Sequence, residues 1–411
     1  MPGRHRHLQL TLSTRTPIKP VSEPPAAMVP RGGGGLRLRI DPLLFVAAIG
    51  LVACSVVTLK GATVDDVAGN PNFYVYRQLA FGVIGVVLMW GVSRLDYSRL
   101  RELRYPVYGF MILSILVVSV LGSTVNGATM SIETPFFNIQ PSELGKVLLV
   151  VALSGFIVDN LRRPGRRTTA RIVLIALVPT ALVIAQDLGS ALAYMAGLTG
   201  MLFVAGVPWR HFAALGALVV TAITLTLVVL PAVGVDVLKP YQTDRLTSFL
   251  HPADVLGSEG YQQAQSKIAI GSGEKTGRGV DNATQTSLDF LPEHHTDFIY
   301  AVVGETYGFA GAALVLSLYA LLIWRGLHIL TTAKNLFGAL IAGGITLMLL
   351  FEVFVNVGMT VGIMPITGIP APLLSYGGSS VLSTFLALGL LQSIHAQARE
   401  TAASKSRASV L

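Results

Sequence analysis

The sequence has few charged residues and almost no cysteine for its length. Charged residues make up 13% of the 411 residues, whereas 52% are hydrophobic. Soluble domains carry about 25% charged residues, so this balance excludes an ordinary soluble protein and indicates a membrane protein. The one cysteine, Cys54, lies within an apolar run. A disulfide framework within the chain is therefore impossible, and thiol chemistry is not expected.

A concentrated basic surface is also missing, although the formal net charge is +8. The basic residues are scattered over short loops between apolar runs, which argues against nucleic-acid binding and suggests topology signals instead. The first 40 residues are rich in proline, glycine and arginine and contain no apolar core of the signal-peptide type. We expect residues 1–40 to form a disordered, basic cytoplasmic tail.

Long apolar runs dominate the rest of the chain. A helix that crosses the hydrocarbon core needs about 20 mainly apolar residues. Ten runs reach or approach that length, at about 43–59, 76–93, 106–122, 142–159, 170–186, 188–207, 211–231, 298–325, 336–362 and 375–395. The sequence therefore predicts an all-α integral membrane protein, with a ten-helix domain over 41–396 and a cytoplasmic tail over 397–411. Only Gln186 and Asp187 separate the fifth and sixth runs, which predicts a tight hairpin or a broken helix there.

The distribution of arginine and lysine orients these helices. If the N-terminal tail is cytoplasmic, alternate loops are cytoplasmic and hold most of the basic residues: Arg94, Arg99, Arg101, Arg104, Arg162, Arg163, Arg166, Arg167, Arg171, Arg210, Arg325, Lys334, Arg399, Lys405 and Arg407. The opposite short loops contain only Lys60. This positive-inside pattern places both termini in the cytoplasm. The long loop 232–297 then faces outward, which its own basic residues do not contradict because long loops translocate largely regardless of charge.

The outer loop ends in a polar stretch that leads directly into the eighth run. Asp297 is the last charged residue of this stretch, so it is expected at the outer mouth of the bundle. A carboxylate placed partly in water and partly against apolar side chains tends to have a raised pKa, which suits a general base. The alternative interpretation, which the spacing alone favours, is a solvated helix N-cap stabilised by the helix dipole. The residue pattern leaves both interpretations open.

Several ionisable residues lie within the apolar runs or at their junctions. They are Arg77, Glu143, Lys146, Asp187, Glu305 and Glu352. A charge at membrane depth costs several kcal/mol unless it is paired or faces water, so each is a candidate functional residue. Buried ion pairs that only hold helices together are the alternative for any single residue. Six such groups in one bundle favour a polar interior cavity.

The segment from Met364 to Ser380 is rich in proline and glycine. Three prolines at 365, 370 and 372 prevent a continuous helix, so an irregular or re-entrant segment beside protein or water is expected. Gly377 and Gly378 permit close approach of the backbone to a ligand or to another helix. A plain loop followed by small-residue helix packing is the alternative.

Four motifs in order make the chain resemble the shape, elongation, division and sporulation family, whose members include RodA and FtsW. These motifs are Gln140-Pro141-Ser142-Glu143 with Lys146, the run from Gln186 to Leu192, the run from Pro292 to Phe298 with Glu305, and the segment from Pro365 to Ser380. The resemblance extends from about Ile40 to Ile394. The residues Tyr241, Gln242 and Arg245, together with 265–273, are closer to RodA than to FtsW.

The resemblance implies a ten-helix peptidoglycan glycosyltransferase of the bacterial cytoplasmic membrane. Such an enzyme polymerises lipid II on the outer face, for elongation in the RodA-like case, and works with a class B penicillin-binding protein. Asp297 matches the essential aspartate of the family, and the other motif positions expected to bind substrate are Arg77, Glu143, Lys146, Asp187, Arg245, Glu293, Thr296, Glu305, Ser375 and Gly377. Two departures occur. Met130 and Ser131 stand where the family usually has an Arg-Trp pair, and Thr306 follows Glu305 where a second glutamate is common.

The mechanism expected from these residues is an inverting sugar transfer. Asp297 removes a proton from the 4-hydroxyl of an acceptor sugar, and Arg245, Lys146 and Arg77 stabilise the departing undecaprenyl pyrophosphate. A divalent cation, Mg²⁺ or Mn²⁺, could share that task, although no ligand cluster for it is visible in the sequence. Two other functions stay open: a lipid II transporter, for which no internal repeat is found, and an FtsW-like division polymerase or scaffold for a penicillin-binding protein.

Overall fold

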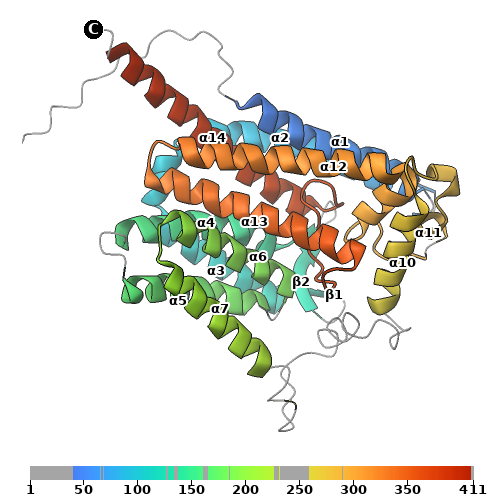
Figure 1. Cartoon of the computed structure of the whole chain (residues 1–411), viewed down its shortest axis with the longest axis horizontal. Coiled ribbons are helices and arrows are strands. Elements are labelled where there is room, and N and C mark those ends of the chain that lie inside the picture. The colour runs from blue at the N-terminus through green and yellow to red at the C-terminus, as the bar shows by residue number, and fades with distance from the viewer. Residues whose placement is uncertain are drawn as a thin grey trace, which may run out of the picture. The chain divides into compact units, whose positions relative to one another are not determined.

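Long apolar helices form most of the structure (Figure 1). We describe it from a computed structural model for residues 40–64, 66–67, 69–125, 128–133, 138–160, 165–184, 186–225, 231, 259–288 and 290–408. Residues 39–411 belong to one compact unit, and everything below concerns the described part of that unit. The predicted tail 1–40 and Arg245 lie outside the described residues, apart from Ile40.

Eight of the described helices are long and apolar enough to cross a membrane. They are α1 (Pro42–Ala62), α2 (Phe73–Ser93), α3 (Arg104–Leu121), α4 (Pro141–Asn160), α5 (Arg166–Ile184), α12 (Ile299–Thr332), α13 (Leu336–Val361) and α14 (Gly378–Ala408). The prediction of a multi-pass helical membrane protein is confirmed. The described helices α6 (Leu188–Val204) and α7 (Trp209–Thr224) have 17 and 16 residues, fewer than the about 20 that a full crossing needs.

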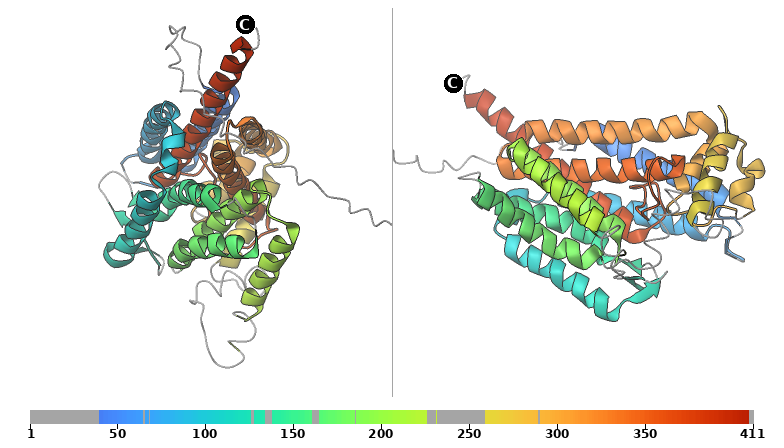
Figure 2. Two further views of the ribbon diagram at one scale, coloured as in Figure 1. Left: turned by 90° about the vertical axis from the view of Figure 1, so that its left-hand side faces the viewer. Right: turned by 60° about the horizontal axis from the view of Figure 1, so that its bottom comes forward.

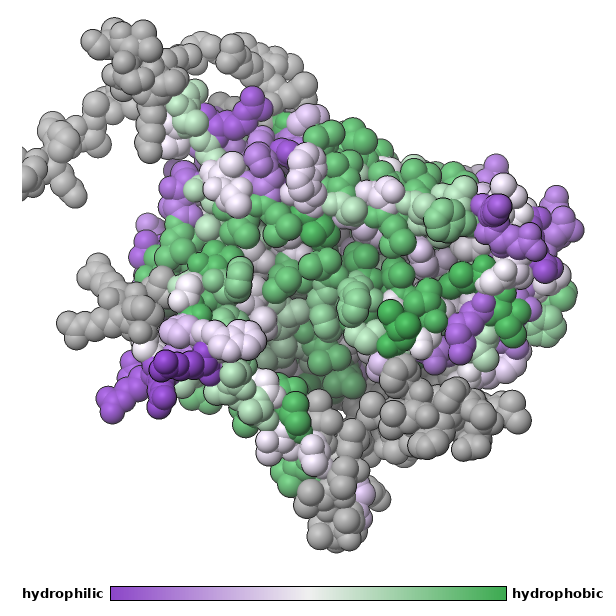
Figure 3. Space-filling view, in the orientation of Figure 1, coloured by the Kyte–Doolittle hydropathy of each residue, from purple (hydrophilic) through white to green (hydrophobic). Residues whose placement is uncertain are grey.

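Helices α4 and α14 lie at the centre of the bundle. In each, 83% of the apolar stretch is buried, against 17% in α3. Close contacts join α14 to α2, α13 to α6 and α12, and α1 to α12 (Figures 1 and 2). The face seen in Figure 3 is apolar over α12 and α13 and hydrophilic toward both ends of these helices. That distribution is the one expected for a bundle whose middle lies in lipid.

Two local features differ from the sequence expectation. Residues between α3 and α4 form three short antiparallel strands, β1 (Ser123–Val125), β2 (Ala128–Glu133) and β3 (Asn138–Ile139), in the order β1-β2-β3. The strands were missed because they are short and are not apolar runs. In addition, helix α14 is longer than the tenth predicted run of about 375–395 and continues through residues 397–408 of the predicted tail. Figure 2 shows this end of α14 leading away from the other helices.

The segment before α12 is folded against that helix. It contains α10 (Glu259–Ser272), η3 (Val280–Asn282) and α11 (Thr284–Ser287). Helix α12 is kinked at Gly308, whose φ of 62° strongly favours glycine. The kink frees the carbonyls of Glu305 and Thr306, and these accept hydrogen bonds from the backbone N–H groups of Arg278 (2.9 Å) and Gly279 (3.1 Å). These hydrogen bonds hold the segment before α12 against the kinked part of that helix.

The buried residue Asp41 connects the start of α1 to two other helices. The carboxylate of Asp41 caps α1 by accepting from the N–H groups of Leu43 and Leu44, both at 3.1 Å, and is paired with the guanidinium of Arg325 in α12. The amide group of Gln392 in α14 accepts from the Asp41 N–H (2.6 Å) and donates to its carbonyl (3.1 Å). These contacts tie α1 to α12 and α14.

Candidate functional site

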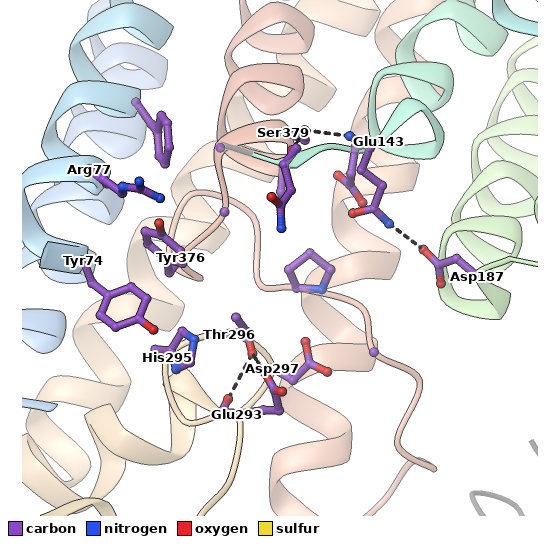
Figure 4. A pocket seen from close by; sticks show the side chains of 18 of the residues that line it. Tyr74, Arg77, Glu143, Asp187, Glu293, His295, Thr296, Asp297, Tyr376 and Ser379 are labelled. Carbon is purple, nitrogen blue, oxygen red and sulfur yellow. Dashed lines mark hydrogen bonds between the residues drawn. The ribbon is translucent and has the colours of Figure 1, made fainter. Parts of the chain in front are cut away.

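A polar cavity of about 610 Å³ opens between the turn before α12 (291–298), the proline-rich segment 362–377 and the ends of α2, α4, α6 and α14. Its wall includes seven of the eleven site residues that the sequence predicts. The seven are Arg77, Glu143, Asp187, Glu293, Thr296, Asp297 and Gly377. In Figure 4 most of the labelled side chains among them point toward one space from different elements. Residues from segments far apart in the sequence therefore meet at one site.

Asp297 lies on the cavity wall and is partly exposed. The turn that carries it is closed by hydrogen bonds from the N–H groups of Thr296 and Phe298 to the carbonyl of Glu293, each at 3.2 Å. Glu293 has a φ of 55°, and its carboxylate accepts from the Thr296 hydroxyl at 2.7 Å. The N-cap position of α12 belongs to Phe298. Of the two interpretations of Asp297, the placement favours a role in the cavity over a role as helix cap.

The turn is fastened to the proline-rich segment by backbone contacts. The hydroxyl of Ser375 donates to the carbonyl of Thr296 (2.6 Å) and accepts from the N–H of Ala371 (2.8 Å), while the N–H of Tyr376 donates to the carbonyl of His295 (3.0 Å). Ser375 is 1% exposed and does not line the cavity. Its observed contacts hold the two loops together, so the structure does not place it where it was predicted to touch substrate.

Asn356 in α13 completes this fastening. Its side-chain amide donates to the carbonyls of Asp297 (3.0 Å) and Ile369 (2.8 Å), and the residue is fully buried. The sequence analysis missed this residue. The sequence did contain a signal for it, because Asn356 is a single side-chain amide within the apolar run 336–362 and a buried amide needs hydrogen-bond partners.

Aromatic side chains form one side of the cavity. The rings of Tyr74 and His295 have centroids 4.7 Å apart, and Tyr74 also meets Tyr376 edge to face at 4.8 Å. The guanidinium of Arg77 lies 4.2 Å from the centroid of the Phe73 ring. Burial and the neighbouring His294 lower the pKa of His295, so its imidazole is neutral at pH 7. An apolar wall beside charged groups suits a sugar substrate, whose faces stack on aromatic rings and whose hydroxyls seek polar partners.

A buried charge cluster lies behind the cavity. The ammonium of Lys146 is 2.8 Å from the carboxylate of Glu143 and 2.6 Å from that of Glu352. Glu143 lines the cavity, whereas Lys146 faces a small space of about 10 Å³ next to it. The structure thus places Lys146 away from the main cavity with its charge balanced by two carboxylates. This is a different position from the predicted one, in which it stabilises a leaving group.

Asp187 caps α6 at the cavity edge. Its carboxylate accepts from the N–H (3.2 Å) and hydroxyl (2.5 Å) of Ser190, and the amide of Gln140 lies 3.4 Å away. Burial raises the pKa of Asp187, and the nearby Glu143 adds to this shift. The helix break expected between the fifth and sixth runs is present, because α5 ends at Ile184 and α6 begins at Leu188.

Glu305 is fully buried in α12 and lies away from the cavity. Its carboxylate accepts from the N–H groups of Gln285 (2.8 Å) and Thr286 (3.1 Å) and from the Thr286 hydroxyl (2.7 Å). It therefore holds α11 in place, and its direct contact with substrate stays a prediction. The sequence correctly identified a carboxylate within an apolar run, but only the tertiary structure shows its hydrogen-bond partners.

The loop that departs from the family pattern forms part of the hairpin. Met130 and Ser131 lie in β2, whose partner strand β3 ends at Ile139. The carbonyl of Asn138 accepts from the Ser379 hydroxyl (2.7 Å), and Ser379 accepts from the N–H of Gln140 (3.0 Å). The hairpin therefore reaches the cavity through Asn138 and Gln140.

Comparison with known proteins identifies the family. A sequence profile of the cell cycle proteins FtsW, RodA and SpoVE matches residues 38–400. The chain belongs to this family. The peptidoglycan glycosyltransferase MrdB of Escherichia coli K12 is 34% identical over 363 residues, which cover 87% of this chain and 94% of that protein. The probable peptidoglycan glycosyltransferase FtsW of Alkalilimnicola ehrlichii is 35% identical, over 90% of this chain and 92% of that protein.

Solved structures of relatives have the same fold. The rod shape determining protein RodA of Thermus thermophilus has a TM-score of 0.64 and 30% identity, over 88% of this chain and 98% of that chain. A chain from a peptidoglycan synthase complex, described as coordinating polymerization and crosslinking, has a TM-score of 0.74 and 32% identity, over 88% of this chain and 99% of that chain. The family resemblance predicted from the motifs is confirmed.

Proposed function

We propose that this chain is a peptidoglycan glycosyltransferase that polymerises lipid II into glycan strands, with Asp297 as the general base. Family membership and relatives named as peptidoglycan glycosyltransferases support the activity. The observation that carries the mechanism is the position of Asp297 on the wall of a polar cavity beside Arg77 and aromatic rings. The cavity volume of about 610 Å³ is in the range of small-molecule sites and can hold the sugars of a substrate.

The proposed reaction is a single displacement. The 4-hydroxyl oxygen of the acceptor sugar attacks the anomeric carbon of the donor sugar as its proton passes to the carboxylate of Asp297. The bond between the anomeric carbon and the pyrophosphate oxygen breaks, and undecaprenyl pyrophosphate leaves with inversion at that carbon. Because the leaving group is already good, one positioned base is sufficient, and such a base typically contributes about 10²–10⁴-fold.

The leaving pyrophosphate needs positive charge. Arg77 lines the cavity and is our main candidate, with Arg245 as a second that lies outside the described residues. Lys146 ranks behind these two candidates because Glu143 and Glu352 balance its charge. A Mg²⁺ or Mn²⁺ ion is also proposed, since the carboxylates of Glu293 and Asp297 on the cavity wall are the hard oxygen ligands such ions prefer. When bound, the ion would neutralise charge on the pyrophosphate.

The membrane arrangement remains part of the proposal. We propose ten crossings, with α6 and α7 as the shorter two, both termini in the cytoplasm of a bacterium, and a large outer loop over 232–297. The positive-inside pattern supports this orientation. It puts the cavity mouth at the outer face, and the three parts of the chain remain 1–40, 41–396 and 397–411.

A class B penicillin-binding protein is the proposed partner. The similar structure in a complex that coordinates polymerization and crosslinking supports it. We favour a RodA-like role in elongation, although relatives named MrdB and FtsW are equally similar, at 34% and 35% identity. A division role is therefore the alternative.

One assay tests the proposal directly. The purified full-length chain, with and without a class B penicillin-binding protein, is incubated with labelled lipid II in detergent and in liposomes. Formation of glycan strands supports a polymerase. Movement of lipid II across the bilayer without polymer would instead establish a transporter. If neither polymer nor movement is observed, with or without the penicillin-binding protein, the scaffold function is favoured.

A further inference from the structure

Three side chains with metal-binding atoms meet where the loop between α1 and α2 packs against the turn before α12. The carboxylate oxygen Oδ2 of Asp66 is 3.3 Å from Nε2 of His294 and 3.9 Å from Nδ1 of His295. The three candidate ligand atoms all lie within 4.8 Å of one another. The proposed sugar transfer uses none of the three, although His295 also lines the cavity.

The orientation of His294 is that of a metal ligand. Its Nδ1 is 3.2 Å from the carbonyl of Leu291, a contact that requires Nδ1 to carry the proton and to donate it. When the ring is neutral, the opposite nitrogen, Nε2, presents a lone pair toward Asp66. A backbone carbonyl that holds the far ring nitrogen in this way is the usual outer support of a metal-bound histidine.

That lone pair is buried without a partner. His294 is 5% exposed, and its Nε2 has no hydrogen-bond partner among the described residues. The Nδ1 of His295, aimed at the same carboxylate, is also buried and unpartnered there. Each of these nitrogens that carries no proton faces the carboxylate oxygen with its lone pair, a repulsion that a cation between them removes.

We propose that Asp66, His294 and His295 bind one Zn²⁺-class divalent ion. Bond lengths of about 2.0–2.2 Å in a tetrahedral site separate ligand atoms by roughly 3.2–3.6 Å. The separations of 3.3 and 3.9 Å are close to that range, and all three ligand atoms lie within 4.8 Å of one another, so side-chain shifts on the order of 1 Å reach that geometry. Two nitrogen ligands and one oxygen favour zinc and neighbouring transition metals over Mg²⁺ or Ca²⁺. Three protein ligands leave the fourth position for water.

The ion would fasten the loop between α1 and α2 to the turn that carries Asp297. His295 precedes Asp297 by two residues, and its carbonyl is already held by the N–H of Tyr376. A second anchor on the His295 side chain would restrict the same turn. This inference stands on the three side chains alone and does not depend on the proposed sugar transfer.

The test is metal binding by the purified full-length chain, with any affinity tag removed because polyhistidine binds the same ions. The protein is stripped with a chelator, dialysed against Zn²⁺ and analysed for metal content, and Co²⁺ is titrated in parallel to record its visible spectrum. The variants are Asp66→Asn, on an exposed loop, and His294→Gln. The control is His328→Ala, which removes an exposed histidine at the far end of α12.

We expect about one equivalent of Zn²⁺ in the parent and His328→Ala proteins and a melting temperature raised by at least about 2 °C. Co²⁺ should give the intense visible bands of a four-coordinate site. Asp66→Asn and His294→Gln should lose the bound metal, the bands and the thermal shift. Equal binding by parent and Asp66→Asn proteins, or no binding by the parent, would overturn the proposal and leave a histidine–carboxylate ion pair. Either of these two outcomes would leave the result of the polymerase assay, and so the proposed function, unchanged.

Discussion

The side-chain amide of Asn356 holds the backbone carbonyl of Asp297 at 3.0 Å. The same amide donates to the carbonyl of Ile369 at 2.8 Å, so one residue of α13 fixes both loops that form the cavity floor. Since Asn356 is fully buried and does not line the cavity, it acts on Asp297 by positioning it.

Replacing Asn356 with Leu should impair both stability and activity. The substitution keeps the approximate volume and leaves two buried carbonyls without a donor, which costs about 1–3 kcal/mol for each group. We expect a lower melting temperature and a reduced polymerisation rate at saturating lipid II, with little change in KM.

The control for this prediction is Asn160→Leu, which removes an amide that donates to the carbonyl of Phe156 at 2.8 Å near the opposite end of the bundle. It should leave the rate unchanged. A rate for Asn356→Leu equal to that of the parent would show that the turn keeps its position without this contact.

Replacing Asp297 with Asn should abolish polymerisation while the protein still folds. Asparagine preserves the size and the hydrogen-bonding capacity of the side chain but cannot accept the proton of the sugar hydroxyl, so we expect a loss of about 10²–10⁴-fold. Glycan strand formation from labelled lipid II, lipid II binding and the melting temperature are the measurements. The exposed Asp281, in η3 of the segment before α12, provides the matched control Asp281→Asn. Polymer formation by Asp297→Asn at the parent rate would refute the assignment.

Replacing Lys146 with Met should strongly destabilise the bundle. The carboxylates of Glu143 and Glu352, each 3% exposed, would lose their shared cation, and breaking a buried pair in this way costs about 3–5 kcal/mol. The double variant Lys146→Met with Glu352→Gln should recover part of that loss, because it removes one of the uncompensated charges. Thermal unfolding in detergent measures both effects. The exposed Lys334 gives the control Lys334→Met, expected within about 0.5 kcal/mol of the parent.

The Asp41–Arg325 pair should make stability depend on pH in the acid range. Burial alone would raise the pKa of Asp41, but hydrogen bonds from Arg325 and from the Leu44 N–H and the charge of Arg325 lower it below its ordinary value of 3.8. A lowered pKa means that the ionised carboxylate stabilises the fold above pH 3.8 and that this contribution is lost as pH falls through the lower folded-state pKa.

Asp41→Asn should therefore be less stable than the parent at pH 7, by about 1.5–3 kcal/mol. The difference should shrink as the pH falls below about 4. Melting temperatures of both proteins across this range are the measurement, and the exposed Glu102→Gln serves as control. A constant difference at every pH would show that the ion pair contributes nothing and that other contacts of the Asp41 side chain account for the loss.

Part of this protein was predictable from local sequence. Apolar runs predict membrane helices because each residue contributes its own transfer free energy, whatever its partners are. The same reasoning marked Asp297, Glu143 and Glu305 as intramembrane or near-membrane charges that require an explanation. The strands between α3 and α4 and the length of α14 were not predictable in this way, since short strands and helix extensions depend on contacts with other segments.

The sequence by itself determined that the chain is a multi-pass helical membrane protein with polar motifs concentrated around a few junctions. Only the tertiary structure decided which of those polar residues share the cavity. It separated Arg77 and Asp297, on the cavity wall, from Lys146 and Glu305, which are bound by partners elsewhere. It also brought Asp66 to His294 from a distant segment. Hydropathy is a property of single residues, whereas hydrogen bonds and ion pairs belong to pairs whose distance the fold sets.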